Sequence, residues 1–411
     1  MATAIQDDMF THEAISDPYT YYGRIRDEDP VHWNELYQLW VVTCHDDVVW
    51  MTRHHELFSS EVFKRDTKSP YPAIDESDLG LYQFMREFFM DMFIHRDRPV
   101  HTLQRKVVHK WFNPESMEMW RPTVRSVVKD LLDEGGEKGR MDVMGDFATP
   151  LPLLVISQMM GVPVEDRSFM RSMAKKLLFV DRGEADRMRP LTDGIKEIME
   201  YLSPLVAERV AQPVDENDLL SVLASGEKTG AFTRDEVVAN AVLLLVAGHE
   251  TTINLICNGT LAFSQHPDQW ELLRRGRFEE PDTLVRATEE CLRYDPPVKS
   301  LERIASEDVE LGGKVLKEGE RIRWIIASAN RDPEQHENPD NFDLSRWPNT
   351  HVAFGSGIHH CLGANLARLE AQEAFKALSE RYGSINLETN ELEYHPSITF
   401  RSLKTLPVLL S

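Results

Sequence analysis

The sequence predicts a mainly α-helical fold with a few small β-sheets, and three observations lead to this prediction. A long apolar stretch runs from a capping signal at Thr233 to about Ser264, enough for a helix of roughly 45 Å. Residues 120–230 contain several amphipathic segments with helical periodicity. Strand-like patterns are confined to residues 39–43 and to the chain after Val298.

The composition limits the classes of function. The 411 residues carry a formal charge of −22, which argues against partners such as nucleic acid or an anionic membrane surface. The first residues show no signal peptide, and polar residues interrupt the apolar stretch 237–261, so we expect a buried helix and no membrane span. The four cysteines have neither disulfide-scaffold nor zinc-site spacing, which favours a cytoplasmic protein: Cys44, Cys257, Cys291 and Cys361.

The N-terminal third combines a strand region with an aromatic segment. Residues 39–43 are predicted to form a strand, and residues 45–52 a short helix. Residues 82–94 are crowded with Met and Phe side chains, a composition that suits an adaptable apolar pocket but is more common in ordinary core. From these residues alone, core is the favoured interpretation.

A charged helix is predicted over residues 101–112. His101 and Arg105 are four residues apart and therefore lie on one face. Lys106 and Lys110 make the other side basic, which a solvated helix surface explains equally well.

The centre of the long helix departs from the usual composition of buried helices. Residues 247–252 include Gly248, Glu250, Thr251 and Thr252. A central Gly costs about 1 kcal/mol relative to Ala, and a buried carboxylate costs several kcal/mol unless it is paired. Thr can also bond to the carbonyl four residues earlier and bend the helix. We interpret this cluster as functional and regard a merely tolerated polar kink as the weaker alternative.

Two further elements complete the chain. A helix is predicted over residues 282–294, in which Glu290 and Arg293 form an i, i+3 pair that, taken alone, is typical of a surface. After Val298 short strands follow, and the chain ends in strands at about 398–400 and 405–409.

Cys361 stands between a Gly-rich turn and a predicted helix over residues 362–375. The positive end of a helix dipole and the unpaired N–H groups there favour a thiolate. Such a thiolate can be a nucleophile, a redox centre or a metal ligand. An inert buried cysteine is the starting alternative.

Three motifs in the same order resemble those of the cytochrome P450 family. Residues 354–363 have the pattern F-x-x-G-x-H-x-C-x-G, residues 247–252 the pattern A-G-x-E-T-T, and residues 290–293 the pattern E-x-x-R. The resemblance, to the bacterial form without a membrane anchor or fused reductase, covers nearly the whole chain. It implies one heme domain over 1–411, with a β-containing part at about 31–60, a helical core at about 95–296 and the heme-ligand loop with the C-terminal elements at about 297–411.

The resemblance also implies a heme b cofactor. Cys361 corresponds to the iron ligand, and a thiolate ligand favours cleavage of the O–O bond. Glycines around it, Gly363 among them, let the backbone approach the porphyrin. Four further residues correspond to partners of the heme propionates: His101, Arg105, Arg303 and His359. Glu290 and Arg293 then become a buried structural pair.

By the same resemblance, the protein is a monooxygenase. Glu250 and Thr251 correspond to the pair that delivers protons during O2 activation, whereas Thr252 is structural. Electrons from NAD(P)H would arrive through a separate ferredoxin or flavodoxin with its reductase. Lys106, Lys110 and Arg368 are candidates for docking this partner. The alternatives are a peroxide-driven peroxygenase, a nitric oxide reductase or a non-catalytic heme-thiolate sensor; the Glu250/Thr251 pair argues against the first two.

Two departures and a predicted pocket remain. Arg98 replaces a proline of the family pattern, and Asn341 replaces an arginine that usually pairs with the Glu290/Arg293 unit, for which Arg346 is a candidate substitute. The substrate is expected to be a hydrophobic small molecule. The family map gives nine candidate wall residues: Phe84, Phe88, Phe89, Leu177, Phe179, Leu244, Val298, Leu301 and Ile398.

Overall fold

A computed structural model describes residues 5–65, 78–135, 139–166, 169–170, 172, 188–276 and 282–411. Its α-helices are α1 (His12–Ser16), α2 (Pro18–Glu28), α3 (His45–Arg53), α4 (Val62–Arg65), α5 (Leu79–Met90), α6 (Val100–His109), α7 (Pro114–Glu118), α8 (Arg121–Gly135), α9 (Pro150–Met159), α11 (Met188–Ala211), α12 (Leu219–Lys228), α13 (Arg234–Gln265), α14 (Pro267–Arg275), α15 (Thr283–Tyr294), α16 (Ile326–Ala329) and α17 (Ala364–Arg381). Shorter helical turns are η2 (Phe93–His95), η3 (Lys110–Phe112), η4 (Val143–Ala148), η5 (Val164–Asp166) and η6 (Gly357–His359).

Within the described residues the strands form three small sheets. They are β1 (Val31–Asn34), β2 (Leu39–Val42), β3 (Phe58–Ser59), β4 (Arg140–Asp142), β5 (Ser300–Ala305), β6 (Val309–Leu311), β7 (Lys314–Leu316), β8 (Arg321–Ile325), β9 (Ile385–Leu387) and β10 (Pro407–Leu410). The largest sheet has the order β1-β2-β8-β5-β3 and is antiparallel except for the β2–β8 pair. The other sheets have the orders β4-β10-β9 and β6-β7. The predicted mainly α class with small sheets is therefore confirmed.

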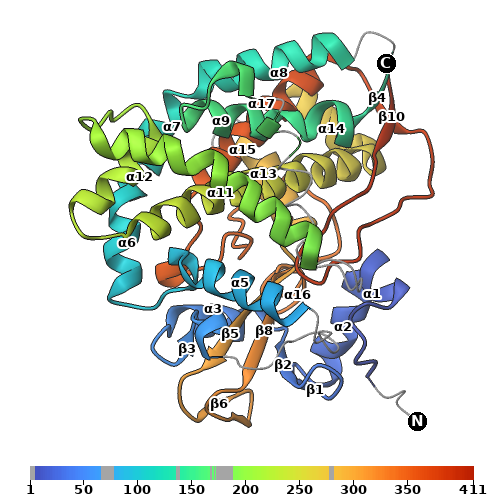
Figure 1. Ribbon diagram of the computed structural model, residues 1–411. Coiled ribbons are helices and arrows are strands. Elements are labelled where there is room, and N and C mark those ends of the chain that lie inside the picture. Colours follow the sequence, from blue (N-terminus) through green and yellow to red (C-terminus); the bar gives the residue numbers. More distant parts are fainter. Residues whose placement is uncertain are drawn as a thin grey trace.

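Helix α13 is the central element of the helical part. Thr233 and Glu236 form the predicted capping box, and His266 caps the C-terminal end. The helix packs against α9, α11, α12 and α17, and Figure 1 shows it running across the middle of the helical layer, above the five-stranded sheet. By length and composition α13 could cross a membrane, but 72% of its most apolar window is buried inside the protein. It is therefore a core helix, as its polar interruptions predict.

Other predicted elements appear with shifted ends. The helix expected over 282–294 is α15, with Asp282 as its N-cap. The helix expected over 362–375 is α17, which begins two residues later, at Ala364, and runs on to Arg381. The strand expected at 398–400 is reduced to one isolated bridge between Val298 and Phe400. Of the stretch 120–230, for which amphipathic helices are predicted, residues 173–187 lie outside the described part of the chain.

Candidate active site

The loop before Cys361 is closed by its own backbone. The N–H of Cys361 donates to the carbonyl of Phe354 over 2.9 Å. Gly357 has a positive φ of 69°, and a Cβ at this position would lie 2.3 Å from the Thr52 carbonyl oxygen. Glycine is therefore required here for both backbone conformation and space. The hydroxyl groups of Thr52 and Ser356, 2.6 Å apart, join the loop to α3.

The Cys361 side chain is accessible but lies deep within the protein. It is the exposed cysteine of the four, yet desolvation by burial raises the pKa of its thiol; the backbone N–H of Gly363, Arg105 and Arg368 lower the pKa in part. Exposure and desolvation are compatible when a side chain faces an enclosed space inside the protein. The donors around the sulfur are those that would stabilise a thiolate. Cys361 is therefore not a packed core cysteine.

Histidine and arginine side chains gather beside this loop. The rings of His101 and His359 lie 4.0 Å apart between centroids. Burial, together with Arg105, Arg98 and Arg303, lowers the pKa of His101 to about 4. Burial likewise lowers the pKa of His359, which Arg303 lowers further.

This basic cluster has the chemistry of an anion site. Both ring nitrogens of His101 are buried without a hydrogen-bond partner among the described residues. Burial lowers the pKa of Arg303 to about 10, with Asp97 opposing the shift. A bound dianion would compensate the mutual repulsion of these groups and satisfy the orphaned nitrogens. The residues present therefore fit the two carboxylates of a heme.

Arg105 lies closer to the cysteine loop. Its guanidinium donates to the carbonyl oxygen of His360. Burial lowers the pKa of Arg105, and Cys361 raises it. Arg105 thus faces the thiol loop as well as the histidines. Arg98, the departure from the family pattern, is exposed and contributes to the lowered pKa of His101.

The polar cluster of α13 lies in an unbroken helical segment. The hydroxyl of Thr251 donates to the carbonyl of Ala247 over 2.8 Å, which is the i−4 bond expected of a helical threonine. Glu250 is 6% exposed. Ala247 is exposed and Thr251 half-buried on a helix that is otherwise mostly buried, so this side of α13 borders open space. The Thr251 side chain therefore borders that space, whereas Glu250, the preceding residue, is buried.

Glu290 and Arg293 form a buried pair. Both side chains are fully buried, and two bonds of 2.8 Å connect them. Arg293 also donates to the backbone carbonyls of Asn330, Pro339 and Asn341. The surface interpretation of this pair is therefore wrong. Nε of Arg346 lies 3.5 Å from Glu290 Oε2, where it can supply the charge that Asn341 lacks.

The described wall candidates fall into separate groups. Phe84, Phe88, Phe89 and Leu244 belong to or pack against the main helical core, Val298 and Leu301 pack against the sheet, and Ile398 is buried with the N-terminal helices. Phe84 and Phe88 stack, and Lys196 lies 5.0 Å from the Phe84 ring. Leu177 and Phe179 lie outside the described residues.

Of the three docking candidates, two have no ion-pair partner among the described residues. Lys106 and Lys110 are exposed on and just after α6. Arg368 instead forms two bonds with Glu289, of 2.6 and 2.8 Å, and lies over the Phe354 ring.

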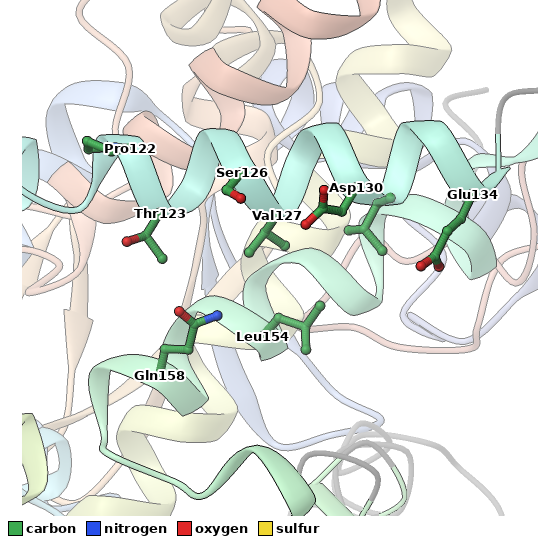
Figure 2. A pocket seen from close by; sticks show the side chains of 9 residues that line it. Pro122, Thr123, Ser126, Val127, Asp130, Glu134, Leu154 and Gln158 are labelled. Carbon is green, nitrogen blue, oxygen red and sulfur yellow. The ribbon is translucent and has the colours of Figure 1, made fainter.

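A separate groove lies between α8 and α9. Figure 2 shows side chains from both helices lining it, and its volume is about 550 Å³. It combines acidic groups, such as Asp130 and Glu134, with apolar ones, such as Val127 and Leu154. None of the predicted site residues lines it.

Sequence reasoning missed several residues of the basic cluster. Ser60 bonds His359 Nε2 over 2.9 Å, and Asp97 accepts from both Ser59 and the Ser60 backbone. His95 is also close, since it contributes to the lowered pKa of His359. Asp97 directly precedes Arg98, the departure from the family pattern, and this position was a signal that could have been used. Ser60 offered no such signal.

Comparisons with known proteins agree with these features. A family model described as Cytochrome P450 matches residues 34–382. The biotin biosynthesis cytochrome P450 of Bacillus subtilis is 36% identical over 401 residues, covering 96% of this chain and 97% of that protein. The cytochrome P450 monooxygenase PikC of Streptomyces venezuelae is 37% identical, covering 96% and 91%. The crystal structure of P450BioI in complex with an acyl carrier protein ligated by hexadec-9Z-enoic acid has a TM-score of 0.86 at 35% identity, covering 97% and 100%.

Proposed function

Because the chain belongs to the cytochrome P450 family of heme-dependent monooxygenases, we propose that it inserts one oxygen atom from O2 into a hydrophobic small molecule, with Cys361 as the iron ligand of heme b. The heme supplies O2 binding and activation when it is bound, and a thiolate ligand favours O–O cleavage. The observation that carries the proposal is Cys361 itself, an accessible thiol that faces a desolvated space, with N–H and cationic donors around it.

The basic cluster supports a role in binding the cofactor. His101, His359 and Arg303 would hold the propionates, with Arg105 between them and the cysteine loop. Charge-assisted hydrogen bonds to two carboxylates would satisfy the unpaired nitrogens of His101. A Cβ at Gly363 would point into open space, with no atom within 4 Å. Glycine at this position would therefore leave that space to the macrocycle and let the backbone run close to it.

Glu250 and Thr251 would handle protons. The Thr251 hydroxyl, already bonded to the Ala247 carbonyl, can accept a hydrogen bond from a water at the open side of α13. The Glu250 carboxylate would pass protons from outside to that water. Both residues act as proton carriers or holders, and neither bonds covalently to substrate.

The electron source is a further part of the proposal. Electrons from NAD(P)H would come through a ferredoxin or flavodoxin and its reductase in the cytoplasm, and the exposed cations Lys106 and Lys110 would meet an acidic partner. Arg368 is the weaker docking candidate because Glu289 already neutralises it. An acid–alcohol pair on α13 favours the O2 route over a peroxide-driven one, which needs no proton delivery to O2. The monooxygenases among the relatives argue against a non-catalytic sensor.

Cys361→Ser tests the central assignment. We expect the reduced carbon monoxide complex to lose the absorption band characteristic of thiolate ligation. Cys44→Ser, a change at a half-buried cysteine far along the chain, should keep it. Survival of the thiolate band in Cys361→Ser would disprove the assignment.

A ligand screen for the low-to-high-spin shift of the wild-type heme, followed by turnover of the hits, would then identify substrates.

A further inference from the structure

A buried asparagine on α13 holds the segment that connects α5 to α6. Asn240 is 0% exposed. Its Oδ1 accepts from the N–H of Phe93 over 2.9 Å, and its Nδ2 donates to the carbonyl of Asp91 over 3.0 Å. A second bond from Nδ2 goes to Glu236, one turn earlier on α13, and orients the amide. One side chain thus satisfies backbone groups of a segment 147 residues away in sequence.

An ion pair fastens the same segment at its other end. Arg96 lies 3.1 Å from Glu236 and 3.4 Å from Asp91. Glu236 is also the second half of the capping box of α13. The first turns of α13 and residues 91–96 are therefore joined at two places through buried or half-buried groups.

Residues 91–96 contact both the aromatic side chains near the end of α5 and the histidine and arginine cluster beside the cysteine loop. Phe93 is buried with its ring 6.5 Å from that of His101. The His95 ring stands edge-on to Phe63 and Phe89, at 4.7 and 6.2 Å. It also bonds the Ser60 backbone and lies near Arg303.

We propose that Asn240 is a positioning residue that fixes residues 91–95 against α13 and thereby sets the pocket boundary formed by His95 and the end of α5. The identification of this space as the substrate pocket rests on the proposed function. Asparagine suits the position because one amide supplies both the acceptor for Phe93 and the donors for Asp91 and Glu236. A leucine of similar size supplies neither and leaves buried backbone groups unpaired.

Hydrogen exchange tests directly whether the Asn240 side chain holds the segment 91–95. In Asn240→Leu we expect the backbone amide of Phe93 to exchange about tenfold faster or more, because it loses its only bond to α13 described above. Asn258→Leu is the matched control, since Asn258 is a buried asparagine of the same helix that bonds the carbonyls of Asp295 and Arg401 instead. It should leave Phe93 within about twofold. If Asn240→Leu does not fold, Asn240→Ala removes the same bonds.

Ligand binding tests the consequence for the pocket. With heme-loaded protein, the Kd for 4-phenylimidazole should rise relative to that for imidazole by about threefold or more in Asn240→Leu, since only the aryl group reaches the pocket boundary. Asn258→Leu should keep the wild-type ratio. Unchanged Phe93 exchange, or faster exchange with an unchanged Kd ratio, would overturn the proposal. The exchange measurement needs no heme, so it stands even if the proposed heme function fails.

Discussion

Glu370 on α17 is a buried acid without a cationic partner in the part of the chain that the structure describes. It is 1% exposed, and neither carboxylate oxygen has a partner in hydrogen-bonding geometry among the described residues. Burial raises its pKa from 4.5 to about 8, although the Thr252 hydroxyl opposes part of the shift. Glu373, one turn later, has the opposite character: burial raises its pKa, but hydrogen bonds from Arg125 and Arg121 bring it below the ordinary value.

Glu370 should make the protein less stable as the pH rises. Between pH 4.5 and 8, Glu370 keeps its proton in the folded protein but releases it in the unfolded chain, so a rise in pH favours unfolding. The contribution of Glu370 to the free energy of unfolding is therefore most favourable below pH 4.5 and declines up to pH 8. Glu370→Gln is neutral throughout. From pH 5 to 8, urea unfolding should show the wild type losing about 1–3 kcal/mol relative to this variant. Glu373→Gln should instead cost stability in the higher part of this range. Parallel pH curves for wild type and Glu370→Gln would contradict the assignment.

Thr251 offers a second test at the scale of one residue. In Thr251→Ala we expect substrate binding to persist while the share of electrons that reach product falls roughly tenfold, because proton delivery is lost. The remaining electrons should appear as hydrogen peroxide, which a peroxidase assay measures. Thr260→Ala is a matched control: Thr260 makes the same i−4 bond, of 2.7 Å to Ile256, in a buried part of α13. Equal coupling in the two variants would count against the proton role.

At the scale of elements, local signals were predictable and distant contacts were not. The caps of α13 and α15 follow from Thr233, Glu236 and Asp282, because a capping residue and its partner lie within one turn. The clasp of Asn240 on Phe93 could not be predicted, since nothing local distinguishes a buried asparagine with a distant partner from a tolerated one. Glu290 and Arg293 show the same limit: their spacing is local, but their burial depends on the segment around Asn341.

The Arg293 side chain connects α15 to the coil that follows α16. It makes two bonds to Glu290 and three to backbone carbonyls. A lysine has three donors and no planar fork, so Arg293→Lys leaves buried acceptors unpaired. We expect a loss of about 3–5 kcal/mol in the free energy of unfolding, measured by urea denaturation. Arg286→Lys, on the same helix, where the guanidinium donates to the Ser345 carbonyl near the surface, should lose much less. Similar losses would show that the Arg293 network has no special weight.

At the scale of the whole molecule, the family and the helical architecture followed from three motifs, whereas the pocket wall stays a prediction. Cys361, Glu250 and Glu290 stand in short patterns with fixed spacing. The wall candidates instead came from a map of segments, and the described ones fall into three packing groups. Which apolar side chain faces a pocket depends on the packing of several elements, and composition does not determine it. The division of residues 1–411 into parts of one heme domain stays a prediction.

Because the net charge is strongly negative, docking of an acidic electron donor should depend on the few places where cations lie on the surface. A chain with a formal charge of −22 repels an acidic ferredoxin except where cations gather, and Lys106 and Lys110 are exposed together at α6. In Lys106→Glu/Lys110→Glu, the KM for a [2Fe–2S] ferredoxin should rise about tenfold at low salt, and the difference from wild type should shrink at high salt because ions screen it. Steady-state reduction with varied ferredoxin measures both effects. Lys404→Glu, at a lysine paired with Glu393 near the C-terminus, should change the KM little. If the double substitution leaves the KM unchanged, the ferredoxin does not dock at Lys106 and Lys110.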